Sequence, residues 1–594
     1  MTSDQRSTRS LLLGIWSHLS KRRRVQLGVL LLVMLASSAA ELLSLGAVLP
    51  FLAVLTDVQG LWQQPLVRSL AAQVGITSAN QPLLILVVAL VFASAAVLAA
   101  AVRLLNLRLN SRLAAAVGSD LSGEAYRRTL YQPYGVHVQR NSSTVITTTS
   151  TQIDFTILGL FALLQLATSG LVAVGLLAGL LWIDLSIALA VMLLFGGAYG
   201  ALVILLRKEL HTNGVRISAA LDKQLKALQE GLGAIRDVLL DGSQATYLQI
   251  YRQADLPLRQ LQAKNQYLGA FPRFTLEAFG MVAIALLGSV LVLQRGSGAA
   301  VVPLLGALAL GAQRLLPALQ QVYSGWAVLK GYNAALVAVL AMLDQPMPAL
   351  TNVTAPLPWR QQLQLQSVSF RYAPEMPEVL RALTLEIRRG ERLGLIGGTG
   401  SGKSTTVDLL MGLLVPTEGQ LFVDGQDLHD PKRPELLSAW RANIAHVPQS
   451  IYLADSSIAE NIAFGVPVDQ IDQERVRRAA SQAQIAAFIE ASDEGYESFV
   501  GERGIRLSGG QRQRIGIARA LYKQADVLVF DEATSALDGD TERAVMEAVA
   551  GLSRDLTLVM IAHRLSTVAH CDRVIELRQG VVLREMTGWQ AANG

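Results

Sequence analysis

Apolar stretches of about 20 residues, long enough to cross a bilayer, occur only within the first 330 positions of the chain. They predict membrane spans at 25–55, 83–107, 155–182, 185–206, 274–293 and 301–323. Six crossings return the chain to the side on which it began. The hydropathy pattern therefore predicts a helical membrane half followed by a soluble half.

Basic residues set the expected orientation, because Lys and Arg in short flanking segments favour the cytoplasmic side of a membrane. They concentrate at 21–24, before the first span, and in the segments that follow the second and fourth spans. The intervening loops, 57–81, 183–184 and 294–300, hold few basic residues. We therefore expect the N-terminus and the soluble half to be cytoplasmic.

A cleaved secretory signal at 21–40 is a competing interpretation, since a basic stretch, an apolar run and small residues at 36–40 resemble one. Cleavage would leave five spans and place the soluble half outside the cell. The apolar stretch also continues past Ala40. We therefore favour an uncleaved first span.

Two segments between spans are too long to be simple loops. Sequence that favours helices covers 110–131, 144–154, 216–231 and 243–266. Helices of about 20 residues extend about 30 Å, so these are predicted to project beyond the membrane. We expect their turns, near 132–143 and 235–242, to contact the soluble half. The alternative is a pair of solvated surface helices.

A proline-rich boundary follows a predicted helix at 325–343, and strand-like segments at 363–372, 383–387 and 392–396 then lead into a glycine-rich loop. The loop fits G-x-x-x-x-G-K-[ST], whose backbone N–H groups surround phosphate, whose lysine reaches the β- and γ-phosphates and whose serine hydroxyl coordinates Mg²⁺. A helix is expected from the lysine onward. The predicted nucleotide-binding residues are Gly397, Gly398, Thr399, Gly400, Ser401, Gly402, Lys403, Ser404 and Thr405.

An apolar strand at 527–530 ends in two carboxylates, Asp531 and Glu532. In a phosphate-binding domain, the two carboxylates of such a pair have different roles. Asp531 is expected to hold Mg²⁺, usually through water, and Glu532 to orient and deprotonate the attacking water. Solvated acids after a strand would be the interpretation if the pair stood alone. His563, after a strand at 556–561, is a candidate for bonding the γ-phosphate, although a lone histidine is more often structural.

Composition agrees with a large membrane protein. The chain has 594 residues, of which 51% are hydrophobic and only 16% charged, less charge than a soluble protein of this size carries. Its formal net charge of +5 is small for the length, and we expect no nucleic-acid partner. The single cysteine, Cys571, excludes an internal disulfide and a cysteine-based metal site.

Over residues 361–585 the soluble half resembles the nucleotide-binding domain of ATP-binding-cassette (ABC) transporters. The glycine-rich loop, Leu-Ser-Gly-Gly-Gln at 507–511 and Ser-Ala-Leu-Asp at 535–538 carry the resemblance. It implies that Tyr372 stacks on adenine, that Gln449 joins Mg²⁺ and senses the membrane half, and that His563 is the switch histidine. It also implies nucleotide contacts from Ser508, Gly509, Gly510, Gln511 and Asp538.

In that family two nucleotide-binding domains dimerise head to tail, so Ser508 and Gly510 of one subunit would close the ATP bound at Lys403 of the other. One membrane domain and one ATPase domain per chain imply a homodimer with two equivalent sites; a heterodimer is the alternative. The implied cofactors are ATP and Mg²⁺.

The implied fold is a six-helix, exporter-type membrane domain with long intracellular helices, fused to an α/β P-loop ABC domain. The expected domains are a cytoplasmic N-terminal segment at 1–24, a transmembrane domain at 25–330, a linker at 331–360 and the nucleotide-binding domain at 361–594. This order resembles an exporter and not an importer.

Ionisable residues within predicted spans bear on the cargo, because they are costly in a membrane and usually face a cavity or a partner. Glu41, Arg103, Glu277 and Arg314 are such residues, and Arg273 stands at a membrane edge. The three arginines would together favour an anionic headgroup such as phosphate or pyrophosphate. Snorkelling or internal Arg–Glu pairs are the alternative.

Segments 102–106, 271–277 and 313–317 resemble those of bacterial lipid-linked oligosaccharide flippases, which hold the lipid pyrophosphate with such arginines. Residues 65–74 suit the short external helix of that family. The resemblance implies a flippase of the bacterial inner membrane whose cargo is a polyprenyl-pyrophosphate-linked oligosaccharide. The alternatives are an exporter of another amphipathic lipid or a hydrophobic drug, and a cassette ATPase that acts as a channel, regulator or sensor without transport.

Overall fold

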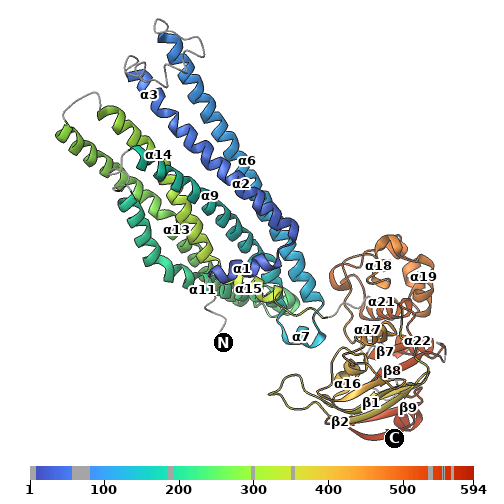
Figure 1. Cartoon of the computed structure of the whole chain (residues 1–594). Coiled ribbons are helices and arrows are strands. Elements are labelled where there is room, and N and C mark those ends of the chain that lie inside the picture. Colours follow the sequence, from blue (N-terminus) through green and yellow to red (C-terminus); the bar gives the residue numbers. More distant parts are fainter. Residues whose placement is uncertain are drawn as a thin grey trace. The chain divides into compact units, whose positions relative to one another are not determined.

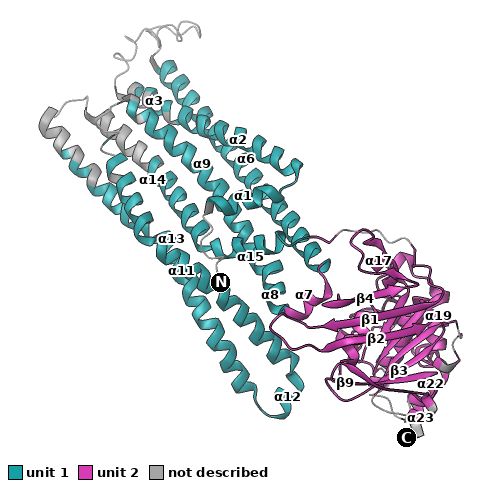
Figure 2. Cartoon of the chain, turned by 60° about the horizontal axis from the view of Figure 1, so that its bottom comes forward, with its two compact units in different colours: residues 1–131, 140–346 teal, residues 132–139, 347–594 magenta. Residues whose placement is uncertain are grey.

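The structure is a computed structural model that describes residues 8–56, 81–183, 189, 192–295, 301–348, 355–532, 539–551, 553, 555–562 and 568–593. The chain divides into two compact units, residues 1–131 with 140–346 and residues 132–139 with 347–594 (Figure 2). The division falls between Pro346 and Met347, within the segment predicted as a linker. We refer to them as the helical unit and the ATPase unit.

The helical unit is built from long helices that run side by side (Figure 1). Short π-helical turns at Thr148–Gln152 and Met192–Gly196 precede two of them. The helices are α1 (Thr8–His18), α2 (Lys21–Gly46), α3 (Val48–Thr56), α6 (Gln81–Leu130), α8 (Ser142–Thr147), α9 (Ile153–Ile183), α11 (Gly197–Gly233), α12 (Ile235–Leu240), α13 (Gln244–Arg295), α14 (Val301–Gly331) and α15 (Asn333–Leu343).

Three helical stretches of the described residues are long and apolar enough to cross a membrane: Lys21–Ser44, Pro82–Leu130 and Ser142–Gly179. Leu315–Gly331 and Asn333–Leu343, bent by 53°, make a fourth if they count as one span. The spans predicted at 185–206, 274–293 and 301–323 coincide with α11 and the turn before it, α13 and α14, parts of which lie outside the described residues.

Two details of the predicted helices are corrected. The first span, expected to be continuous over 25–55, is divided into α2 and α3, because Pro50 lacks the N–H that would bond to the carbonyl four residues earlier. The intracellular helices are not separate elements. α6, α11 and α13 run on from their spans for 50, 37 and 52 residues in all.

The ATPase unit contains two sheets. One is a six-stranded sheet of order β10-β9-β3-β8-β7-β6, in which β3 pairs in parallel with β8 and β9, and β7 pairs in parallel with β6 and β8. Its strands are β3 (Arg392–Ile396), β6 (Ile444–Val447), β7 (Val527–Asp531), β8 (Thr557–Ile561), β9 (Arg573–Arg578) and β10 (Val581–Met586).

The other sheet is four-stranded and antiparallel, with the order β2-β1-β4-β5. Its strands are β1 (Gln362–Phe370), β2 (Leu380–Arg388), β4 (Glu418–Val423) and β5 (Gln426–Asp427). The helices of the unit are α7 (Tyr134–Gln139), α16 (Lys403–Leu410), α17 (Glu435–Ala442), α18 (Ile458–Ile462), α19 (Gln473–Gln482), α20 (Ala486–Glu490), α21 (Gly509–Tyr522), α22 (Gly539–Ala550) and α23 (Gly588–Asn593).

Much of the predicted linker is folded into one unit or the other. α15 buries Leu336, Leu340 and Leu343 against α1 and its neighbours, because these residues form one apolar face of a helix. Trp359 belongs to the ATPase unit, where it stacks on Trp440 with ring centroids 5.3 Å apart. Of the predicted linker, residues 331–346 are thus assigned to the helical unit and residues 347–360 to the ATPase unit.

Of the two turns expected to contact the soluble half, the first supplies residues 132–139, which belong to the ATPase unit. There Gln139 Nε2 donates a hydrogen bond to the Tyr372 carbonyl at 2.7 Å. The second turn contains α12 and belongs to the helical unit.

Cys571 lies in the apolar core of the ATPase unit, with its Sγ 4.0 Å from Met560 Sδ. Burial raises the pKa of the Cys571 thiol to about 12. The side chain is therefore an inert structural thiol.

Candidate functional site

The predicted ATP residues meet at the carboxyl edge of the parallel sheet, where open α/β sheets bind ligands. The glycine-rich loop follows β3, Gln449 follows β6, and Asp531 and Glu532 end and follow β7. Strand order places β8 between β3 and β7, with β6 on the other side of β7. Pairing of Val447 with Phe530 and of Asp531 with Ile561 brings three strand ends level with one another.

The loop between β3 and α16 depends on glycine at two positions. Gly397 and Gly402 have φ values of 146° and 102°, a region that residues with a Cβ avoid. A Cβ on Gly397 would also lie 2.3 Å from the Leu577 carbonyl oxygen, and one on Gly402 would lie 2.6 Å from Leu380 Cδ2. The backbone path of the loop is thus closed to larger residues.

The chemistry of this loop fits a phosphate group. Lys403 is only 6% exposed, and its Nζ donates to the carbonyls of Gly397 and Gly398 at 2.8 and 3.1 Å. The buried Ser401 Oγ has no hydrogen-bond partner among the described residues. The N-cap residue of α16 is Gly402, which has no side chain with which to cap the helix. A buried ammonium, an unused hydroxyl and the N–H groups of a helix N-terminus are suited to an anion.

Glu532 is held in a strained backbone conformation, with φ 49°, which is uncommon for a residue other than glycine. Its N–H donates to the Ile561 carbonyl at 3.1 Å. Gln449 Nε2 donates to Glu532 Oε2 at 2.8 Å. The carboxylate is therefore oriented by the side chain of Gln449, which follows the adjacent strand β6. A general base must be held in this way to accept a proton from one water molecule.

Negative charge accumulates beside the loop. Burial and the nearby charge of Asp531 raise the pKa of Asp408, on α16, to about 6. Within the described residues no group of three or more His, Cys, Asp or Glu is arranged to hold a metal ion, so a cation here would depend on hydroxyl and phosphate oxygens as well. Mg²⁺ binds oxygen ligands of these kinds. The candidate protein ligands are the Ser404 hydroxyl, the Gln449 amide oxygen and the Asp531 carboxylate.

The predicted adenine platform, Tyr372, follows β1 in the antiparallel sheet. Its ring meets Phe370 edge-on at 5.0 Å between centroids, and its hydroxyl lies 3.1 Å from Thr405 Oγ1. The ring is therefore fixed to the first turn of the phosphate-loop helix.

The signature sequence forms the start of α21. Ser508 is the N-cap residue: its Oγ accepts from the Gln511 N–H at 3.2 Å, and Gln511 Oε1 accepts from the Ser508 N–H at 2.8 Å. This reciprocal capping box explains why glutamine follows the two glycines. It leaves the N–H groups of Gly509 and Gly510 at the positive end of a 14-residue helix.

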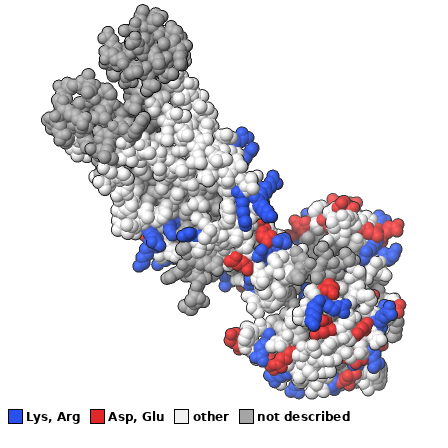
Figure 3. All heavy atoms as spheres, in the orientation of Figure 1, with Lys and Arg blue, Asp and Glu red and all other residues white. Residues whose placement is uncertain are grey.

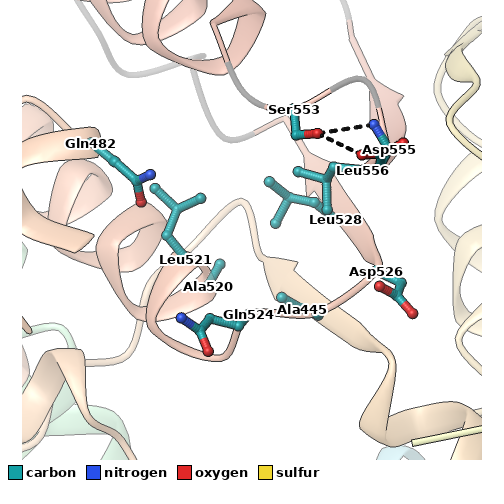
Figure 4. Close-up of a pocket in the computed structure, with 11 residues that line it drawn as sticks. Ala445, Gln482, Ala520, Leu521, Gln524, Asp526, Leu528, Ser553, Asp555 and Leu556 are labelled. Atoms are coloured by element: carbon teal, nitrogen blue, oxygen red, sulfur yellow. Dashed lines mark hydrogen bonds between the residues drawn. The ribbon is translucent and has the colours of Figure 1, made fainter. Parts of the chain in front are cut away.

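Two predicted nucleotide-site residues, Asp538 and His563, lie outside the described residues. The hollow drawn in Figure 4, of about 290 Å³, contains none of the predicted residues. Its lining residues Asp526 and Leu556 precede β7 and β8. The hollow therefore lies at the amino edge of the sheet, opposite the phosphate loop.

Of the three candidate cargo arginines, the structure describes the side chains of two, Arg103 and Arg273, and these do not line the same cavity. Arg103 lines a cavity of about 560 Å³ between α2, α3, α6, α9 and α14. Arg273 is exposed, does not line that cavity, and lies 5.9 Å from the Phe274 ring centroid. The Arg314 side chain and the external helix predicted at 65–74 lie outside the described part.

The same cavity is lined by polar residues that sequence analysis missed, including Asn106, Gln165, Ser169 and Gln321. Uncharged polar residues in apolar helices give little hydropathy signal. The spacing of Ser37, Glu41 and Ser44 (i, i+4, i+7), which places residues on one helix face, was the signal that could have found the cavity.

Comparison with known proteins agrees with this architecture. Residues 380–535 match the family described as ABC transporter. The ATP-dependent lipid A-core flippase of Polaromonas sp. is 32% identical over 426 residues, covering 72% of this chain and 71% of the relative. That of Chromohalobacter salexigens is 39% identical over 260 residues, 44% of each chain.

A different named cargo occurs among the relatives. The leukotoxin translocation ATP-binding protein LktB of Mannheimia haemolytica is 43% identical over 226 residues, which cover 38% of this chain and 31% of the relative. Except for the Polaromonas protein, the matches to these relatives therefore span less than half of their length.

A solved bacterial Atm1-family ABC exporter with ATP bound has the same fold. It superposes with a TM-score of 0.78 at 24% identity, covering 96% of both chains. The fold is that of an ABC exporter, a helical transmembrane domain joined to an ATPase domain. The Polaromonas relative aligns over 426 residues, more than either unit alone contains. The chain therefore belongs to the ABC transporter family.

Proposed function

We propose that this chain is half of an ATP-driven exporter that moves an amphipathic lipid across a membrane, with a polyprenyl-pyrophosphate-linked oligosaccharide as the preferred cargo. The observation that carries the proposal is the Gln449–Glu532 hydrogen bond at 2.8 Å, beside the phosphate loop, in a chain that also contains membrane-length apolar helices. An oriented carboxylate beside a phosphate cradle is what ATP hydrolysis requires.

The residues have separate roles in that hydrolysis. Lys403 and the loop N–H groups hold the β- and γ-phosphates, and the Tyr372 ring stacks on the adenine. Glu532 accepts a proton from water as the water oxygen bonds to the γ-phosphorus and ADP leaves. Gln449 keeps the Glu532 carboxylate oriented. Mg²⁺, when bound through Ser404, Gln449 and Asp531, neutralises phosphate charge.

The site is completed by a second chain. The capped start of α21 offers the N–H groups of Gly509 and Gly510 to a γ-phosphate, and in the family this end faces the ATP of the partner. Two copies of the chain then form two equivalent sites, each also using Asp538 and His563. A symmetric homodimer is the simplest assembly of this kind.

The proposed setting is the bacterial inner membrane, with the ATPase unit in the cytoplasm. On the face drawn in Figure 3, Lys and Arg of the helical unit gather towards one end, while the remaining described surface of that unit is largely uncharged. Such a distribution matches an apolar shaft in lipid with its basic end on the cytoplasmic side.

The cargo assignment is supported by Arg103 in the membrane cavity and by the segments that carry the three arginines. The alternative cargo is a lipid of the kind named for the relatives, lipid A-core. Both are lipids with large polar headgroups, and the two are separated by experiment.

The test is reconstitution in liposomes with ATP-dependent flipping of a fluorescent polyprenyl-pyrophosphate-linked oligosaccharide as the readout. Wild type should flip this lipid, and Glu532→Gln should not while still binding ATP. If the protein flipped only lipid A-core, that lipid would replace the polyprenyl-pyrophosphate-linked oligosaccharide as the proposed cargo. ATP hydrolysis with no movement of either lipid would refute the transport function.

A further inference from the structure

The cavity in the helical unit has a wall of polar side chains that comes from four neighbouring helices. α2, α6, α9 and α14 pack against one another in the described structure (Figure 1). Each contributes at least one polar residue to a space of about 560 Å³, within the size range of small-molecule sites. Those used here are Glu41, Arg103, Asn106, Gln165, Ser169 and Gln321.

Neutral amides and hydroxyls of the cavity wall form two hydrogen-bonded groups. Gln321 Oε1 accepts from Ser169 Oγ at 2.5 Å and from Gln165 Nε2 at 3.2 Å. Asn106 Nδ2 donates to Thr168 Oγ1 at 3.3 Å. Such groups are rare in membrane helices unless they serve packing or a polar ligand.

Hydrogen bonding is incomplete at the cavity wall. Asn106 is 2% exposed, and its Oδ1 has no hydrogen-bond partner among the described residues. One turn further along α6, Asn110 is fully buried, and neither polar atom of its amide has a partner there. Buried amide groups are normally satisfied. Asn106 lines the cavity and Asn110 does not, so of these two side chains only Asn106 could gain a partner from a hydrogen-bond donor bound in the cavity, by a change of its side-chain conformation.

The charged residues exclude a purely anionic site. Glu41 is 7% exposed, and its Oε2 lies 4.0 Å from Arg103 Nη1. The side chain of Arg103 is 58% exposed and that of Glu41 only 9%. The carboxylate therefore lies in the wall and the guanidinium at the rim. A phosphate inside the cavity would be repelled by Glu41, whereas a hydroxyl both donates to carboxylate and accepts from amide N–H groups.

We propose that this cavity is a saccharide subsite, which binds the hydroxyl groups of the lipid headgroup through Glu41, Asn106, Gln165 and Gln321. Arg103, at the rim of the cavity, contacts the pyrophosphate to which the sugar is attached. The assignment rests on the proposed function, since it takes the glycan of the same cargo as its ligand. It divides recognition between a phosphate contact at the rim and a sugar contact inside.

Neighbouring glutamines on α14 provide a matched control. Gln321 is exposed and lines the saccharide cavity. Gln320 precedes it and lines a different cavity, of about 390 Å³, with Asn265 and Gln262. Gln320→Ala and Gln321→Ala remove the same side chain from adjacent positions on one helix.

The test is equilibrium binding to the purified full-length protein in detergent, without nucleotide, of two radiolabelled lipids: a polyprenyl-pyrophosphate-linked oligosaccharide and polyprenyl pyrophosphate without sugar. Loss of one or two hydrogen bonds should raise the Kd for the glycolipid about tenfold in Gln321→Ala and Glu41→Gln. Gln320→Ala should bind it as wild type does. Both cavity variants should retain wild-type affinity for the sugar-free lipid.

Three results would overturn the saccharide subsite: no preference of wild type for the glycolipid, equal weakening in Gln320→Ala, or weakening in Glu41→Gln alone, which indicates a bound cation. Flipping measured on the same preparations separates the two proposals. Flipping of the glycolipid that is indifferent to the cavity variants keeps the transport function and rejects the subsite. Binding of the glycolipid that is weakened by the cavity variants, without any flipping, keeps the subsite and rejects the transport function.

Discussion

The ATPase unit and the helical unit position their polar groups in different ways. In the ATPase unit, Gln449 and Glu532 follow adjacent strands, and backbone pairing fixes how far apart they lie. In the helical unit, Asn106 and Gln321 come from separate helices, and only side-chain packing brings them to one cavity. The first arrangement rests on backbone pairing and is marked by motifs in the sequence, whereas the second rests on side chains that converge only when the helices pack.

The largest expected effect lies in the ATPase unit. Glu532→Gln keeps an acceptor for Gln449 but removes the base, so ATP turnover should fall about 10²- to 10⁴-fold with ATP binding retained. Phosphate release and binding of a fluorescent ATP analogue measure the two quantities. The exposed Glu418→Gln variant serves as the control. Turnover near the wild-type rate would assign the base to another group and weaken the contrast between the units.

Lys403→Ala should lower ATP affinity about 10- to 100-fold, because it removes a charged hydrogen bond to phosphate. The measurement is the Kd for ATP, and Lys432→Ala, at an exposed position of the same unit, is the matched change. Cargo binding without nucleotide should be unaffected. A simultaneous loss of cargo binding would show that the units are not separable in this respect.

The two candidate cargo arginines whose side chains the structure describes, Arg103 and Arg273, should differ. Arg103→Ala should raise the KM for flipping of the lipid about tenfold, by loss of a charged contact at the cavity rim. Arg273→Ala should change it less, because Arg273 does not line the cavity. Initial flipping rates across lipid concentrations measure both. Equal effects would favour the cluster of arginines that the sequence predicted.

The smallest effect is expected at the capping box. Gln511→Ala leaves Ser508 as N-cap but removes the reciprocal bond, a change of about 0.5–1 kcal/mol. ATP turnover at subsaturating ATP should fall by a small factor, with Gln470→Ala, an exposed glutamine of the same unit, unchanged. A loss as large as that of Glu532→Gln would give Gln511 a direct role in the reaction.

Local sequence predicted the phosphate loop because its function resides in one continuous segment with glycines at fixed positions. The Gln449–Glu532 contact joins residues 83 positions apart, so spacing could not predict it. The local pattern singled out Glu532 and the family resemblance Gln449, but neither predicted the hydrogen bond between them. The division of the first span at Ala47, three residues before Pro50, and the continuity of α6, α11 and α13 depend on where a helix is interrupted. The polar cavity of the helical unit was missed because Asn106, Gln165 and Gln321 are uncharged residues whose convergence depends on helix packing.

The burial of Cys571 makes this chain convenient for spectroscopy. The sequence contains one cysteine, and its thiol, with a pKa raised to about 12 by burial, forms little of the thiolate that alkylating reagents attack. Cysteines introduced at exposed positions of α2 and α14 would therefore take up spin labels selectively, without first rebuilding the ATPase core. Distances between such labels can then be followed during turnover in an otherwise native protein.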